Sequence, residues 1–293
     1  MVDLSKMTKW DMGKLFDFSV LPKQSTEADI RRGCQIAKEY NCKAFCFSSS
    51  EWTPIVAEEL KGTDIMVGAA IGFPFGQQSS AVKAFETAEA VRLGATVLDN
   101  CMNVGDLKDK KYDKILAEFK EYVDAAQGVM TKMIIETCFL TKEEIVTATK
   151  LVCEAGIDWV KTSTGQYGGP SVQDVMLMVD AVKGTKTKVK VAGVKDPRPQ
   201  NAFCFIQAGA ELIGTRAAVE ILDAVDEGII GRDPTRKAII KGKAPRAKKI
   251  KYLSQFELHT LIADLNIGTE VNWDWFILLV AKTGMRFSEA LAI

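Results

Sequence analysis

Residues 156–165 have the sequence Gly156-Ile157-Asp158-Trp159-Val160-Lys161-Thr162-Ser163-Thr164-Gly165, and this stretch indicates how the chain folds. A glycine stands at the predicted end of a helix and is followed at once by a short apolar run. Glycine is favoured there because the chain adopts a left-handed conformation as it leaves the helix. Gly94-Ala95 and Gly209-Ala210 repeat the arrangement before other apolar runs. The repetition predicts helices that alternate with parallel strands.

Short apolar runs recur about every 22 to 34 residues within residues 1–226. The eight runs are Leu15–Val20, Ala44–Ser48, Ile65–Ile71, Thr96–Cys101, Met130–Glu136, Trp159–Thr162, Lys188–Ala192 and Leu212–Gly214. The segments between them carry apolar residues at helical spacing, and Thr26 with Asp29 and Thr141 with Glu144 are spaced as helix-capping pairs. Eight such units predict an α/β fold, a closed (β/α)8 TIM barrel. A doubly wound open sheet is the alternative, although no glycine-rich nucleotide-binding motif follows the first run.

The composition, with 47% hydrophobic and 26% charged residues, is typical of a globular protein. The 38 lysine and arginine residues balance the 38 acidic residues, so no net charge attracts the chain to nucleic acid or to a membrane. No apolar run is long enough to span a bilayer, and the first residues lack the apolar segment of a signal peptide. We therefore expect a cytoplasmic protein with no membrane contact.

Cysteine and histidine usage limits the chemistry. Seven cysteines without a Cys-x-x-Cys pair favour reduced, buried thiols over disulfides. His259 is the only histidine in the sequence. A histidine-dependent catalytic triad and a metal site with several histidine ligands are thereby nearly excluded.

The balanced charge conceals a basic segment. Residues 232–251 contain nine lysine and arginine residues, two prolines and one acidic residue, Asp233. Such a segment is typical of a solvated linker. We therefore predict a barrel domain over residues 1–226, a basic linker over 227–251 and a short helical segment over 252–293.

Charged residues late in the buried strands are the candidate site residues, because active sites of this fold lie at the carboxyl ends of the strands. Lys161, Lys190 and Asp99 each stand inside or at the end of an apolar run. Burial and a neighbouring cation both lower the pKa of a lysine, which leaves a free amine that can attack a carbonyl carbon. The alternative is that both lysines extend from the strand ends into solvent.

Several motifs lie at the ends of the predicted strands. They are Phe16-Asp17-Phe18-Ser19-Val20-Leu21, Ile71-Gly72-Phe73-Pro74, Leu98-Asp99, Ile135-Glu136-Thr137, Val160–Gly165 and Val189-Lys190-Val191-Ala192-Gly193. In their order, over residues ~10–224, they resemble the 2-deoxyribose-5-phosphate aldolase family, and the run Lys161–Gly165 is the most specific. The resemblance implies a class I aldolase, a lyase, in a TIM barrel with no metal or other cofactor. Its substrates would be a small aldehyde and a second, phosphorylated aldehyde, which combine to deoxyribose 5-phosphate or a related aldol.

The resemblance also implies roles for individual residues. Lys161 would form the imine with the aldehyde, Lys190 would perturb it, and Asp99 would relay protons through water. The residues expected to bind the substrate or its phosphate are Asp17, Lys132, Thr162, Gly193, Gly214, Thr215 and Arg216. Val194 and Arg216 depart from the glycine pair and the hydroxyl-rich turn of the family, which puts the phosphate site in question. Lys132 has an alternative, structural role as the buried ion-pair partner of Glu136.

The C-terminal residues differ in character from the barrel. Residues 283–291 resemble the first catalytic box of the tyrosine recombinases, or integrases, and Arg286 matches the arginine of that family that binds DNA phosphate. The later recombinase elements are missing, so we expect a fragment that cannot recombine DNA and that packs on the barrel or on a second copy in a homo-oligomer. The alternative function is a DNA-binding, integrase-like fusion protein with a diverged barrel, in which only this segment contacts DNA.

Overall fold

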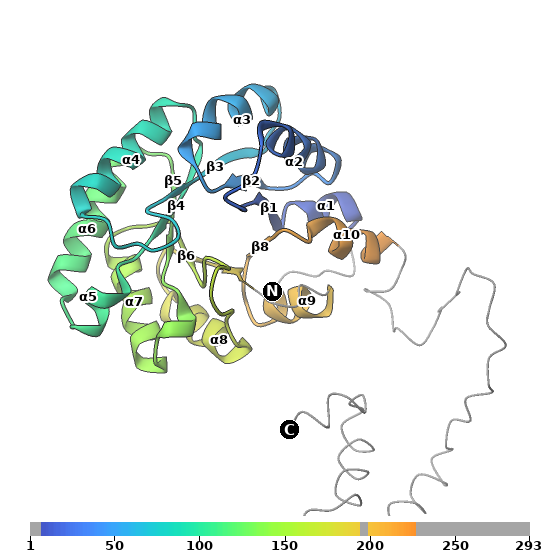
Figure 1. Ribbon diagram of the computed structural model, residues 1–293. Helices are drawn as coiled ribbons and strands as arrows, with labels where there is room; N and C mark the ends of the chain where they lie inside the picture. Colours follow the sequence, from blue (N-terminus) through green and yellow to red (C-terminus); the bar gives the residue numbers. More distant parts are fainter. Residues whose placement is uncertain (1–6, 194–198, 227–293) are drawn as a thin grey trace, which may run out of the picture. The chain divides into compact units, whose positions relative to one another are not determined.

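A closed barrel of parallel strands forms the centre of the computed structural model, which describes residues 7–193 and 199–226 (Figure 1). The strands are β1 (Phe16–Val20), β2 (Ala44–Phe47), β3 (Met66–Ile71), β4 (Val97–Cys101), β5 (Met130–Ile134), β6 (Trp159–Lys161), β7 (Lys188–Ala192) and β8 (Leu212–Thr215). They pair in sequence order, and β8 pairs with β1 to close the barrel. The predicted TIM barrel is confirmed, and the open doubly wound sheet is wrong.

Helices form a ring outside the strands (Figure 1). They are α1 (Lys9–Gly13), α2 (Glu27–Glu39), α3 (Thr53–Glu59), α4 (Ser80–Arg92), α5 (Val104–Lys108), α6 (Tyr112–Ala125), α7 (Lys142–Glu154), α8 (Val172–Ala181), α9 (Pro199–Gln207) and α10 (Ala218–Asp226), with the 3-10 helices η2 (Ser50–Trp52) and η3 (Thr137–Phe139). The capping pairs predicted at Thr26 and Thr141 begin α2 and α7. Gly94, Gly156 and Gly209 have φ values of 107°, 76° and 106°, the left-handed conformation predicted after a helix.

The predicted strands agree with the observed ones to within two residues. The largest difference is at the run Met130–Glu136, because β5 ends at Ile134. Glu136 has a φ of 56° and a ψ of 66°, a left-handed conformation that a strand residue does not adopt. The predicted linker at 227–251 and helical segment at 252–293 lie outside the described residues, and these domain boundaries stay predictions.

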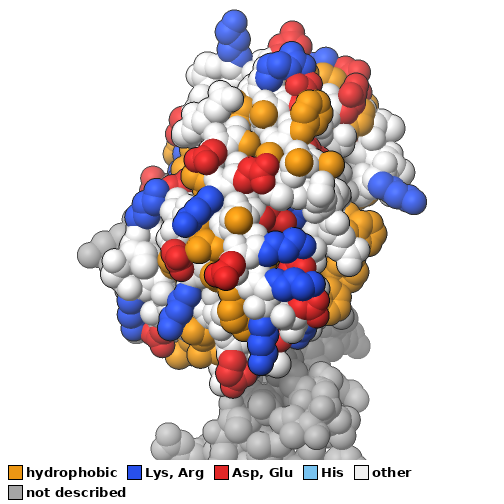
Figure 2. Space-filling model, turned by 90° about the vertical axis from the view of Figure 1, so that its left-hand side faces the viewer, with side chains coloured by type: hydrophobic (Ala, Val, Ile, Leu, Met, Phe, Trp, Pro, Cys, Tyr) orange, Lys and Arg blue, Asp and Glu red, His pale blue; other side chains and the backbone are white. Residues whose placement is uncertain are grey.

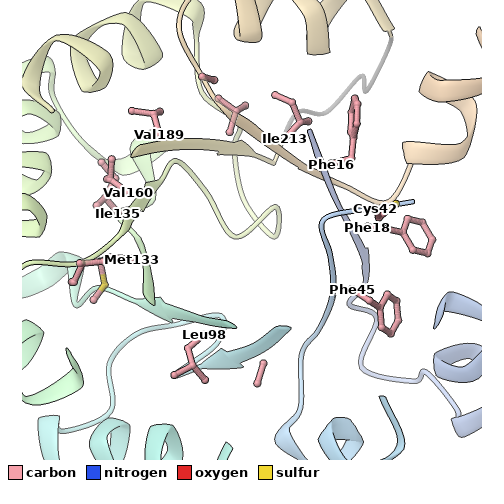
Figure 3. Packing of buried hydrophobic residues seen from close by; sticks show 14 of the residues in the cluster. Phe16, Phe18, Cys42, Phe45, Leu98, Met133, Ile135, Val160, Val189 and Ile213 are labelled. Atoms are coloured by element: carbon pink, nitrogen blue, oxygen red, sulfur yellow. The ribbon is translucent and has the colours of Figure 1, made fainter. Parts of the chain in front are cut away.

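The main hydrophobic core lies between the strands and the surrounding helices. Phe16, Leu98, Val160 and Val189 are all at most 1% exposed and belong to one buried cluster (Figure 3). Because side chains alternate along a strand, the residues next to these point into the barrel. A small apolar cluster inside the barrel consists of Ala44, Cys46 and Val97 with the partly buried Met66 and Met130. Above it, at the carboxyl ends of the strands, the interior is charged.

The surface of the barrel domain has mixed charge. Figure 2 shows one face, on which basic and acidic side chains are interspersed with single hydrophobic ones. No sign of charge dominates this face, in agreement with the balanced charge of the sequence. Within residues 7–193 and 199–226, no helix is long and apolar enough to cross a membrane.

Candidate active site

A cavity of about 450 Å³ opens at the carboxyl ends of the strands. Asp99 of β4, Lys161 of β6 and Lys190 of β7 all line it. Lys161 and Lys190 are register partners on adjacent strands, so their side chains leave the sheet side by side. The barrel thus brings together the three residues that the sequence singled out, and neither lysine extends from the barrel into bulk solvent, since they are 7% and 1% exposed.

Asp99 joins the two lysines. Its Oδ2 atom accepts hydrogen bonds from Lys161 Nζ at 2.5 Å and from Lys190 Nζ at 3.0 Å. A lysine donor and a carboxylate acceptor make both hydrogen bonds charge-assisted. A proton can therefore pass between Asp99 and Lys161 without a rearrangement of either side chain.

Two further ionisable groups complete a buried network. Asp17 Oδ2 lies 2.6 Å from Lys132 Nζ and 2.6 Å from Lys190 Nζ. Lys132 is the register partner of Asp99, and its Nζ lies 3.6 Å from Asp99 Oδ1. Three lysines and two aspartates thus share one site. Of the three lysines, Lys190 is the one whose Nζ lies within 3.0 Å of both carboxylates.

The predicted structural pairing of Lys132 with Glu136 is wrong. Lys132 pairs with Asp17, whereas both carboxylate oxygens of Glu136 accept from the backbone N–H of Thr164, at 3.1 and 3.2 Å. The reason is the end of β5 at Ile134, after which the chain no longer alternates as a strand and Glu136 leaves the inward face.

The buried network lowers the pKa of Asp99 and raises the pKa of Lys190. Burial by itself raises the pKa of Asp99, but the neighbouring lysines, chiefly Lys161 and Lys190, outweigh burial and hold this pKa well below its usual value. Burial likewise lowers the pKa of Lys190, but Asp17 and Asp99 outweigh it and raise this pKa well above its usual value. The prediction that an adjacent cation leaves Lys190 with a lowered pKa is therefore wrong, because two carboxylates contact its amine.

A glycine directly after β7 and one in β8 bring the backbone close to the cavity. Gly193 and Gly214 line it together with Thr215 and Arg216. A Cβ atom at Gly193 would lie 2.7 Å from Ser163 Cβ, and one at Gly214 would lie 2.9 Å from Lys190 Cε. Gly193 also has a φ of 75°, so only glycine fits there, whereas a side chain at Gly214 would displace the amine end of Lys190. The backbone at both positions is open to the cavity. Val194 and Lys195 lie outside the described residues.

Comparison with known proteins agrees with this geometry. A family model described as DeoC/LacD family aldolase matches residues 11–198. The chain belongs to this family. It is an aldolase, and therefore a lyase, as the strand-end motifs predicted.

Individual relatives match the barrel as well. The chain is 41% identical over 215 residues to a deoxyribose-phosphate aldolase of Clostridium novyi (strain NT), which covers 73% of this chain and 96% of that protein. It is 42% identical over 222 residues to that of Carboxydothermus hydrogenoformans, with 74% and 96% covered. The solved structure of the aldolase QR15 has a TM-score of 0.70 and 32% identity, and the match covers 74% of this chain and 96% of that one. The family match ends at residue 198, and Arg286 lies outside the described residues, so the recombinase resemblance stays a prediction.

Two residues expected to bind substrate lie behind the cavity wall of the aldolase. Thr162 is fully buried, and its Oγ1 atom donates to Ala192 O and accepts from Ala192 N, both at 3.0 Å. These two hydrogen bonds join the end of β6 to the end of β7 next to Lys161. Lys132 is also fully buried and does not line the cavity. Asp17, by contrast, does line it.

The cavity also has lining residues that the sequence reasoning did not single out as site residues. They include Ser19, Leu21, Phe47, Phe73, Thr164, Gln166 and Glu220, and Cys46 lines the cavity with them. Ser19, Leu21, Phe73 and Thr164 stood within the quoted motifs, which was a usable signal, whereas Glu220 lies in the first turn of α10 and had none. Burial raises the pKa of the Cys46 thiol to about 11, so this thiol stays protonated. Within the described part of the chain, no cluster of three or more histidine, cysteine or acidic side chains is arranged to hold a metal ion.

Proposed function

We propose that this aldolase cleaves and forms deoxyribose 5-phosphate, or a closely related aldol, through an imine on Lys161. The substrate class rests on the printed names of the relatives, two of which are deoxyribose-phosphate aldolases more than 40% identical to this chain. The choice of lysine rests on one observation. Lys161 contacts a single carboxylate and is 7% exposed in the cavity, whereas Lys190 contacts two carboxylates and is 1% exposed.

The difference between the lysines assigns their roles. Lys190 keeps its proton, because its pKa is raised by Asp17 and Asp99. Its fixed positive charge helps to keep Asp99 ionised. Asp99 can then accept a proton from Lys161, which leaves the Lys161 amine free to add to the carbonyl carbon of an aldehyde.

The chemical steps balance without a cofactor. Addition of the Lys161 amine gives a carbinolamine, and loss of water gives a protonated imine. In the cleavage direction, the hydroxyl group next to the breaking bond gives its proton to a base as its oxygen becomes the carbonyl oxygen of the second aldehyde. The electron pair of the carbon–carbon bond moves towards the imine nitrogen, the second aldehyde leaves and an enamine remains. Protonation of the enamine carbon and addition of water release the small aldehyde and restore the amine. Asp99 carries the protons, since its Oδ2 atom is 2.5 Å from Lys161 Nζ.

A phosphate group of the substrate would bind at the other side of the same cavity. Gly193 and Gly214 offer open backbone there, and Thr215 adds a hydroxyl group. Arg216 is exposed at the rim and supplies a positive charge. These groups suit a phosphate dianion, and Arg216 compensates for the glycine that Val194 replaces.

Borohydride trapping tests the proposal. The protein is incubated with acetaldehyde and sodium borohydride, digested and analysed by mass spectrometry. The expected result is a two-carbon adduct on Lys161, which is absent from the Lys161→Arg variant. An adduct confined to Lys190, or no adduct in a protein that is folded by circular dichroism, would refute the assignment. Light scattering and a salt-dependent DNA-binding assay test the predicted homo-oligomer and the DNA-binding alternative.

A further inference from the structure

The turn that follows β5 holds the loop that follows β6. Glu136 is 5% exposed, and its two carboxylate oxygens lie 3.1 and 3.2 Å from the backbone N of Thr164, which donates to them. The left-handed backbone of Glu136 directs the side chain to this amide. A buried carboxylate therefore fastens the backbone of the Lys161–Gly165 motif three residues after the proposed nucleophile.

Backbone hydrogen bonds flank this contact on both sides. The N–H of Ile135 donates to Lys161 O at 3.0 Å, and the N–H of Thr137 donates to Thr162 O at 2.9 Å. The turn after β5 thus follows the chain of β6 beyond the end of both strands. The backbone of Glu136 makes no hydrogen bond to this part of the chain, but its side chain accepts the next one, from the Thr164 N–H.

Further contacts join the turn after β5 to the loop after β6 beyond Thr164. The rings of Phe139 and Tyr167 pack with their centroids 5.1 Å apart. The N–H of Gly168 donates to Cys138 Sγ at 3.3 Å, and a Cβ atom at Gly168 would lie 2.6 Å from Cys138 Cβ. The two loops are therefore closely fitted along their length, with Glu136 as the charged group between them.

The position of the β6 loop determines the shape of the proposed phosphate site. Thr164 and Gly165 line the cavity that contains Lys161. Gly193 lies directly against Gly165, because a Cβ atom at Gly193 would be 3.2 Å from both Gly165 N and Gly165 Cα. A shift of the β6 loop would open or close the backbone surface that Gly193 presents.

Glu136 acts on the site through Thr164. It does not line the Lys161 cavity but a second cavity of about 310 Å³, with Phe139 and Tyr167 among its other lining residues. Within the described residues it has no lysine or arginine within ion-pair distance, and burial raises its pKa. A buried carboxylate without a cationic partner lowers the stability of the fold, so a neutral side chain would serve stability better. We therefore expect the role of the Glu136 carboxylate to lie in the Thr164 backbone amide that it binds.

We infer that Glu136 is a positioning residue of this aldolase: its carboxylate fixes the Thr164 amide and, through Gly165, keeps Gly193 in place to receive the substrate phosphate. The inference rests on the proposed function. It predicts an effect on substrate binding that depends on the phosphate group, because Asp99 holds the imine-forming Lys161 separately.

Steady-state kinetics with two substrates tests the inference. Glu136→Ala and Glu136→Gln are compared with Glu154→Gln, which removes an exposed carboxylate near the end of α7. For 2-deoxyribose 5-phosphate, KM should rise by about tenfold in Glu136→Ala, the effect of losing one hydrogen bond to a charged group. It should rise less in Glu136→Gln, whose amide oxygen still accepts from Thr164. KM for unphosphorylated 2-deoxyribose and kcat for both substrates should change by less than about threefold, and Glu154→Gln should resemble the wild type.

Equal changes of KM for both substrates, or no change for either, would overturn the inference. Amide hydrogen exchange of the peptide that contains Thr164 gives a readout that needs no activity, and it should be faster in both Glu136 variants than in Glu154→Gln. If Glu136→Ala does not fold, Glu136→Gln decides alone. Failure of the proposed function is seen separately, as a wild type that traps no aldehyde on Lys161. Trapping on Lys161 combined with unchanged exchange at Thr164 refutes only the role of Glu136.

Discussion

The inner and outer faces of the same barrel strands have opposite environments. Leu98 packs among apolar side chains against the helices, and its neighbour Asp99 lies in a network of ion pairs. Val160, labelled in Figure 3, packs in the apolar cluster, and its neighbour Lys161 lines the cavity. Period-two alternation along a strand makes this separation, so one residue step in the sequence divides the groups that stabilise the fold from those that perform chemistry. Substitutions on the two faces should therefore differ in kind.

The largest effect is expected at Lys161 on the inner face. Lys161→Ala and Lys161→Arg should lower kcat at least about a thousandfold, since neither side chain can form an imine and loss of a nucleophile removes the main reaction path. Both variants should keep the circular dichroism spectrum of the wild type. Substantial turnover by either one would contradict the role of Lys161 as nucleophile.

A substitution of Asp17 tests whether the ion-pair network inside the barrel also contributes to the free energy of unfolding. Asp17→Asn leaves Lys132 and Lys190 buried with only one remaining carboxylate. Removal of one partner from a buried ion pair costs about 3–5 kcal/mol, so the free energy of unfolding in urea should fall by that amount. Asp180→Asn is the matched control, because Asp180 pairs with Lys183 at the surface and should leave the melting temperature unchanged. Similar effects of the two variants would show that the inner network is not held by Asp17.

Leu98 tests the outer face. Leu98→Ala should lower the free energy of unfolding by about 2–5 kcal/mol, because the side chain is fully buried and its removal leaves a cavity. Its kcat per folded molecule should stay close to that of the wild type. A large fall in kcat at full folding would show that the two faces are not independent.

Asp99 gives the network a pH dependence. Its pKa is lowered in the folded state, so the unfolded chain binds more protons and the stability it contributes is lost as the pH falls through its folded pKa. The free energy of unfolding of the wild type should therefore begin to fall below about pH 5 and keep falling as the pH approaches the lowered pKa, and this slope should be smaller in Asp99→Asn. The slope is measured by urea titration at each pH. An unchanged slope would mean that the pKa of Asp99 is not lowered in the folded protein.

Arg216 stands at the rim and belongs to neither face. Arg216→Ala should raise KM for 2-deoxyribose 5-phosphate about fivefold to tenfold, because an exposed charge contributes less to phosphate binding than a buried one. KM for unphosphorylated 2-deoxyribose should stay nearly constant. Equal changes for the two substrates would place the phosphate elsewhere.

Much of the barrel was predictable because its signals are local. Glycines at helix ends and apolar runs of strand length placed the strands to within two residues of their observed bounds. The general rule that barrel sites lie at the carboxyl ends of strands then predicted that Asp99, Lys161 and Lys190 meet. The partners within the network were not predictable in this way. The alternative role predicted for Lys132 paired it with Glu136, four residues away, whereas its partner Asp17 is 115 residues away in sequence.

Patterns among neighbouring residues were enough to predict the fold class, the aldolase family and the three charged residues at the strand ends, because periodicity and short motifs are local properties. The tertiary structure alone decided which charges meet. Closure of the barrel by β8 on β1 puts Asp17 between Lys132 and Lys190, and these contacts reverse the expected direction of the Lys190 pKa. The left-handed backbone of Glu136, two residues after the end of β5, directs its side chain away from the barrel interior and towards Thr164. Both outcomes depend on distances between segments far apart in the chain, and such distances are set only when the whole barrel has formed.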